Sequence, residues 1–124
     1  SMELCKVIWD GYREEAEGVH RHTVKPGDEA AWGGLMICAE TDAKAKAWAE
    51  DMEWFWKLWP TAFGQGGVER LIGSPDTLSR RIEEAASTVP INEMFLLIPQ
   101  GISEPEKINA SLELFADKVM PRFQ

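Results

Sequence analysis

The sequence lacks a long apolar run, and no stretch of its 124 residues approaches the roughly 20 apolar residues of a membrane-spanning helix. It also lacks a signal-peptide pattern at its beginning. Basic residues are few, with 13 Lys and Arg against 21 Asp and Glu, so the net charge is -8. Binding to a nucleic-acid backbone needs clustered basic residues. We therefore predict a cytoplasmic protein with neither a membrane nor a nucleic acid as its partner.

Cysteine and histidine are also scarce, with two residues of each. Cys5 and Cys38 lie far apart, and Cys38 falls inside an apolar run, so we expect a small core residue rather than half of a disulfide. His20 and His22 would point to one side of an extended segment, but no third ligand lies near them. The cysteine and histidine spacings also differ from those of zinc sites. The sequence therefore predicts no metal site.

The residues that are present suit one compact domain over residues 1–124. Apolar residues make up 44% of the chain, which is enough to bury a core. Six tryptophans indicate an extended core, an interface, or both. Ser1 and Met2 look like the remnant of a cleaved tag, so we expect the natural chain to start at Met2.

Short apolar runs and periodic segments predict an α/β fold. Residues 34–39 are typical of a strand buried on both faces, as in a parallel sheet, and residues 94–98 predict a second apolar strand. Residues 68–72 fit either a short strand or a helical turn. Helices are predicted over four segments: residues 3–18, 42–59, 74–87 and 103–120. The prediction is thus two or three parallel strands with about four helices.

Three of these helices carry start signals. Thr41 is placed to cap the second helix, and Ser74 followed by Pro75 is a strong start for the third. Ser103 and Glu106 form the pattern of a capping box at the start of the last.

The helix over residues 42–59 is rich in aromatic residues. One stripe at helical spacing predicts a core face, and it consists of Trp48, Met52, Phe55, Trp56 and Trp59. Trp54 lies off this stripe and beside Leu58, which forms a second, smaller apolar face. That face fits a partner surface, a contact with a second subunit, or plain exposure.

Three segments, taken in order, resemble a known family. They are Ala39-Glu40-Thr41-Asp42-Ala43-Lys44-Ala45, Ile72-Gly73-Ser74-Pro75-Asp76-Thr77, and residues 112–123 after the final strand. Their order and spacing are similar to the C-terminal part of the bacterial-luciferase-like, flavin-dependent monooxygenases. The resemblance implies a partial TIM-type (β/α)₈ barrel, about a third of the ~250 residues typical of that fold. It also implies reduced FMN and oxygen as reactants and a small-molecule substrate.

In such barrels the chemistry sits at the C-terminal ends of the strands. The resemblance therefore implies cofactor binding at Gly73 and Ser74, where a helix N-terminus could hold an anion, and substrate contacts at Glu40 and Gln100. A plain capped helix and a solvated carboxylate are the structural alternatives at Ser74 and Glu40. No arrangement of residues predicts a catalytic group.

The strands that supply most of the family's flavin pocket, and its phosphate-binding serine region, have no counterpart in the sequence. We therefore expect a segment or subunit of a luciferase-like FMN-dependent monooxygenase that is not catalytic alone. Its open sheet edges predict association, as a homodimer or with a chain that supplies the rest of the barrel. The alternative is a stand-alone remnant domain that binds a protein partner or a small apolar ligand without catalysis.

Overall fold

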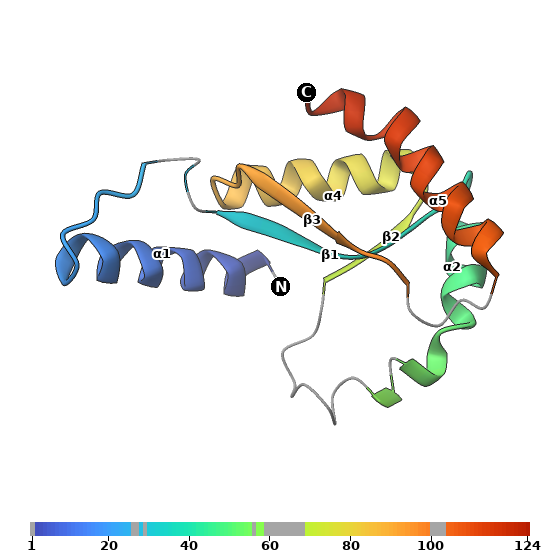
Figure 1. Ribbon diagram of the computed structural model, residues 1–124, viewed down its shortest axis with the longest axis horizontal. Coiled ribbons are helices and arrows are strands. Elements are labelled where there is room, and N and C mark those ends of the chain that lie inside the picture. The colour runs from blue at the N-terminus through green and yellow to red at the C-terminus, as the bar shows by residue number, and fades with distance from the viewer. Residues whose placement is uncertain (1, 26–27, 29, 56, 59–68, 100–103) are drawn as a thin grey trace. The chain divides into compact units, whose positions relative to one another are not determined.

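The structure is a computed structural model, and it describes residues 2–25, 28, 30–55, 57–58, 69–99 and 104–124 (Figure 1). The elements in chain order are α1 (Met2–Gly18), β1 (Ala31–Cys38), α2 (Asp42–Glu50), β2 (Glu69–Gly73), α4 (Pro75–Thr88), β3 (Glu93–Leu97), α5 (Pro105–Lys118) and the short 3₁₀ helix η1 (Met120–Arg122). None of the helices in these ranges combines the length and the apolar composition needed to cross a bilayer. The predicted α/β class is confirmed.

The strands form an open parallel sheet in the order β2-β1-β3. Residues 34–38 of β1 pair with residues 69–73 of β2, from Gly34 opposite Glu69 to Cys38 opposite Gly73. Segment 68–72, for which the sequence leaves two possibilities, is therefore a strand from Glu69 onward. Every residue from Gly34 to Ala39 is buried, because β1 is the central strand of the sheet. The prediction of a strand buried on both faces is confirmed for β1.

The third strand lies beside β1 and not beside β2. In a complete (β/α)₈ barrel, successive strands are neighbours. Here β1 lies between the other two strands, so β2 and β3 are the edge strands of the sheet. As an edge strand, β3 is far less buried than β1, with Phe95 and Leu97 46% and 39% exposed. The predicted strand at residues 94–98 is confirmed, with bounds Glu93–Leu97.

By its internal contacts the chain divides into two compact units. The smaller contains Ser1–Trp32 and Ile82–Phe95, and the larger contains Gly33–Arg81 and Leu96–Gln124. In the smaller unit, the backbone N–H groups of Asn92 and Glu93 both donate to the carbonyl of Ala30. β1 begins at Ala31, three residues earlier than predicted, and this longer strand includes the buried Trp32.

The larger unit has its core where α2 packs on β1. Leu35, Ile37 and Ala39 from β1 meet Ala45 and Met52 from α2 and the turn that follows it. The predicted aromatic stripe is confirmed for the described members, since Trp48 and Phe55 also pack against this cluster. Trp56 and Trp59 of the stripe lie outside what the structure describes.

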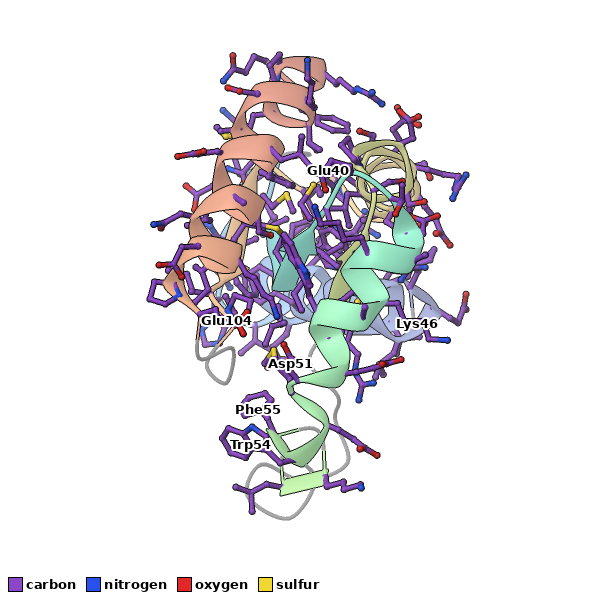
Figure 2. The ribbon with its side chains drawn as sticks, turned by 90° about the vertical axis from the view of Figure 1, so that its right-hand side faces the viewer. Glu40, Lys46, Asp51, Trp54, Phe55 and Glu104 are labelled. Carbon is purple, nitrogen blue, oxygen red and sulfur yellow. The ribbon has the colours of Figure 1, made fainter. Side chains whose placement is uncertain are left out.

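The aromatic helix is shorter than predicted. α2 ends at Glu50, and a turn separates it from helical residues 53–55 and 57–58. The N–H of Met52 donates to Ala49, and that of Phe55 donates to Met52. These i to i−3 bonds tighten the chain, as in a 3₁₀ turn, and Met52 is fully buried there. Trp54 lies beside Phe55, with the ring centroids 5.9 Å apart, and is 54% exposed (Figure 2).

The predicted start of the last helix is wrong. α5 begins at Pro105, and Glu104 is its N-cap residue without a side-chain capping bond. A residue that precedes proline is driven out of the helical region, and Glu104 is extended at φ -105° and ψ 102°. Ser103 itself lies outside the described residues. The other two caps are confirmed, because Thr41 accepts from the N–H of Lys44 at 3.2 Å and Ser74 accepts from that of Thr77 at 3.4 Å.

Asp42 joins the starts of two helices. Its Oδ1 accepts from the backbone N–H of Ser74 at 2.7 Å, and its Oδ2 accepts from the hydroxyl of Thr77 at 3.0 Å. The carboxylate therefore sits at the N-terminus of α4 while its own backbone begins α2. The Ser74 N–H is the main cause that lowers the pKa of Asp42 below its usual 3.8, followed by the Ser74 and Thr77 side chains.

A serine hydroxyl satisfies the last N–H of β1. The N–H of Ala39 donates to Gly73 of β2 at 3.2 Å, whereas the N–H of Cys38 donates to Ser111 Oγ of α5 at 2.6 Å. Both Cys38 and Ser111 are buried. The hydroxyl thus replaces a strand carbonyl at a buried position, where an unpaired N–H costs about 1–3 kcal/mol.

The close approach of β1 and β2 at Gly34 yields a first prediction. A Cβ on Gly34 would lie 2.1 Å from the carbonyl oxygen of Glu69, which is backbone and cannot turn aside. We expect Gly34→Ala to lower the free energy of unfolding by about 1–3 kcal/mol, the usual cost of overpacking. The matched control is Gly11→Ala, since nothing lies within 4 Å of that Cβ and Gly costs a helix about 1 kcal/mol relative to Ala. In urea unfolding, the midpoint should fall for Gly34→Ala and rise for Gly11→Ala. A Gly34→Ala variant with the stability of the wild type would contradict the pairing of Gly34 with Glu69.

The Asp42 carboxylate yields a second prediction, which concerns pH. Because its pKa is lower in the folded chain, its stabilisation is present above pH 3.8 and is lost as the pH falls through the lower folded-state pKa. We expect Asp42→Asn to lower the urea midpoint at pH 7 and to differ less from the wild type near pH 3. Asp76→Asn removes the same charge from an exposed carboxylate at the start of α4 and serves as the control. An equal, pH-independent loss in both variants would rule out this role for Asp42.

Candidate functional site

The candidate site lies in the larger unit, at the C-terminal ends of β1 and β2. A cavity of about 540 Å³ opens there. Its lining comes from the segments that follow both strands and from the end of α5, namely Glu40, Thr41, Asp42, Ser74, Pro75, Asp76, Leu114, Lys118 and Arg122. The structure therefore brings together Glu40 and Ser74, two of the residues that the sequence singles out. Gln100 lies outside the described residues.

Glu40 is an exposed carboxylate held by the helix that follows it. Lys44 Nζ lies 2.7 Å from Glu40 Oε2 and 5.2 Å from the centre of the Trp48 ring, so one lysine contacts both side chains. This pairing is the main cause that lowers the pKa of Glu40. Figure 2 shows Glu40 at the beginning of α2, with Trp54 and Phe55 beyond the opposite end of that helix. Glu40 is thus a fixed, ionised acceptor at neutral pH.

A smaller cavity of about 240 Å³ adjoins the first and shares Glu40 and Leu114 with it. It lies between Trp48 of α2 and the face of α5 that carries Glu113 and Asp117. Cys38 also lines it, but burial raises the pKa of this thiol to about 11. The thiol therefore stays protonated at neutral pH and is a poor nucleophile. Cys38 and Cys5 are both free, which confirms that Cys38 is a core residue rather than half of a disulfide.

Three titratable groups of the site, Glu40, Asp42 and Cys38, have pKa values that do not suit proton transfer at neutral pH. A general acid or base works best when its pKa lies near the working pH. The pKa values of Glu40 and Asp42 are lowered, and that of Cys38 is raised. Thr41 and Ser74 use their hydroxyl oxygens as helix caps. These side chains are therefore placed to bind and orient a ligand.

Two basic side chains line the larger cavity near the C-terminus. Arg122 donates to Asp76 at 2.8 Å, which ties η1 to the first turn of α4. Lys118 lies one turn earlier on α5 and is exposed. Of the cavity's carboxylates, Glu40 pairs with Lys44, and Asp42 is hydrogen-bonded to Ser74 and Thr77. Lys118 and Arg122 are therefore the groups best placed to attract an anionic part of a ligand.

The start of α4 does not offer a ready donor set to a flavin phosphate. The N–H of Ser74, which the resemblance assigns to the cofactor, already donates to Asp42. Gly73 is explained by packing, because a Cβ there would lie 2.7 Å from Thr77 Cγ2 and 3.0 Å from Asp42 Oδ1. A phosphate at this position would have to displace the Asp42 carboxylate. The assignment of Gly73 and Ser74 to the cofactor stays a prediction that requires this movement.

The sequence reasoning missed Asp42, Lys118 and Arg122 as site residues. An acidic residue in the first turn of a helix is a recognisable pattern, and it predicts Asp42 at the start of α2. The pattern does not predict the hydrogen bond from Ser74 to Asp42. Lys118 and Arg122 fall within a segment that carries the family resemblance, and nothing local marks them as cavity residues. Among the residues that the structure describes, no group of three or more His, Cys, Asp or Glu could hold a metal ion.

Comparison with known proteins gives matches in structure only. No known family model and no curated protein matches the sequence. The fold matches the monooxygenase RslO1 from Streptomyces bottropensis (TM-score 0.72, 14% identity), covering 99% of this chain and 39% of that one. It also matches apo-MsnO8 (TM-score 0.64, 17% identity), covering 91% and 40%.

A third match is a type II Baeyer–Villiger monooxygenase, the oxygenating constituent of 3,6-diketocamphane monooxygenase from Pseudomonas putida, in complex with FMN. Its TM-score is 0.73 at 20% identity, and the match covers all of this chain and 41% of that one. The chain thus spans about two-fifths of the length of each of these proteins, and identities this low establish the fold alone. The chain has the fold of part of these monooxygenases, in keeping with its sequence resemblance to the luciferase-like flavin-dependent family.

Proposed function

We propose that the chain forms part of an FMN-dependent monooxygenase and that further strands complete the barrel around the flavin and a small-molecule substrate. The observation that carries the proposal is the fold match, which includes nearly all of this chain but about two-fifths of each enzyme. One of those enzymes is an FMN complex. FMN, when bound, would supply the redox chemistry, and the protein would supply position and charge.

In this proposal the residues at the ends of β1 and β2 contact the ligands. Glu40 is a fixed hydrogen-bond acceptor for a substrate, and Gln100, which follows β3 in the sequence, is the second proposed substrate contact. Lys118 and Arg122 attract the phosphate of FMN without any change at Asp42. Gly73 and Ser74 also contact this phosphate if the Asp42 carboxylate moves away from the N–H of Ser74.

Completion of the barrel requires strands at the free edges of the sheet. Edge strands present unpaired backbone groups to other chains. On β3 and just after it, Phe95, Leu97 and Ile98 are 46%, 39% and 52% exposed, which suits an edge that another element covers. The simplest form of the proposal is a cytoplasmic homodimer, and a chain that supplies the missing strands is the other form.

A titration of FMN with the chain, with light scattering on the same samples, tests the proposal. We expect flavin fluorescence to be quenched in step with association, because the open sheet alone does not enclose a flavin. Riboflavin lacks the phosphate and is expected to bind about tenfold more weakly, as the loss of one charge-assisted contact predicts. An associated chain that leaves FMN fluorescence unchanged would contradict the proposal.

A pair of lysine variants tests the position of the phosphate. Lys118→Ala should weaken FMN binding toward the level of riboflavin and leave riboflavin binding unchanged. Lys46→Ala is the matched control, since Lys46 is also an exposed helical lysine but does not line the cavity (Figure 2). Equal effects of the two variants would exclude a phosphate at Lys118.

A further inference from the structure

A second cavity lies in the smaller unit and shares no lining residue with the site described above. Its volume is about 340 Å³. It is open to solvent and lined by α1, the first residues of β1 and the segments before β1 and after α4, and its larger side chains are Ile8, Trp9, Tyr12, Trp32, Val89 and Ile91. It therefore lies at the N-terminal end of β1, whereas Glu40 follows the C-terminal end of that strand.

None of the described residues that line this cavity carries a charged side chain, although α1 is rich in charge. Lys6 pairs with Asp10, and Arg13 lies 3.8 Å from the same carboxylate. These charged groups pair with one another instead of reaching into the cavity. A charged ligand would thus lose its hydration without gaining a partner, which is costly. The cavity selects for a neutral ligand.

Aromatic rings shape the cavity. The rings of Trp9 and Tyr12 lie 5.9 Å apart with their planes tilted by 38°. Trp32 contributes a third ring from β1, where it is buried with 7% of its surface exposed. Such rings favour stacked or edge-on contacts with another ring, and each contact adds about 0.5–1.5 kcal/mol beyond the burial of area. A flat, cyclic apolar molecule fits this lining better than a flexible chain.

The volume sets the size of the ligand. A dry apolar cavity of about 150 Å³ binds benzene, and small-molecule sites start near 300 Å³. We propose that the cavity bounded by α1 and the start of β1 binds a neutral compound of about two fused rings, similar in size to naphthalene. This inference goes beyond the proposed function, because it concerns another cavity and needs no flavin.

The rim of the cavity provides a sharp test. Val7 and Ile8 are neighbours on α1 with nearly equal exposure, 60% and 62%, but only Ile8 lines the cavity. The probe is N-phenyl-1-naphthylamine, an uncharged dye that fluoresces in apolar surroundings. We expect saturable fluorescence with the wild type, displacement of the dye by naphthalene and no displacement by FMN. Ile8→Glu should weaken binding at least tenfold, and Val7→Glu should change it less than twofold.

A second variant keeps the test independent of the introduced charge. Ala31 is an exposed lining residue on β1, so Ala31→Phe fills the cavity and should also abolish dye binding. Circular dichroism establishes that each variant is folded. Absence of saturable binding in the wild type would overturn the inference, as would equal losses in Ile8→Glu and Val7→Glu. Affinity that falls as the protein concentration rises would also overturn it, because another copy would then cover the cavity.

Discussion

The parallel pairing of β1 with β2 is the constraint on which the larger unit depends. Five residues of each strand pair, and at their first pair the chains approach so closely that only glycine fits at position 34. This register places the ends of both strands level with each other, so that Glu40 and Ser74 reach one cavity. α2 begins just after this same end of β1, and it packs against β1 to form the core of the larger unit.

Charge within the site is largely satisfied by the protein itself. Asp42 acts as an internal anion at the start of α4, and Glu40 is neutralised by a lysine one turn away. Such pairing lowers the pKa values of both carboxylates, away from the neutral range in which a general acid or base works best. These groups therefore suit the binding and orientation of a ligand.

Local signals in the sequence predict much of this fold. The apolar run at residues 34–39, the cap at Thr41 and the start at Pro75 each depend on a few adjacent residues, and the structure confirms them. Segment 68–72 is ambiguous because its strand forms only through pairing with β1. The strand order and the bond from Ser74 to Asp42, which spans 32 residues, are long-range features that no local pattern encodes. The cavity could be predicted only in part for the same reason.

The hydroxyl of Ser111 has a consequence for where the pairing within the sheet ends. It occupies the N–H at the end of β1, on the side of that strand that faces away from β2, which is the side of β3. Backbone pairing on that side could extend past Cys38 only by displacing a buried bond of 2.6 Å. Without the hydroxyl, the buried N–H of Cys38 would lose its partner, which costs about 1–3 kcal/mol. A single hydroxyl on a neighbouring helix thus sets where the ladder on this side of β1 ends.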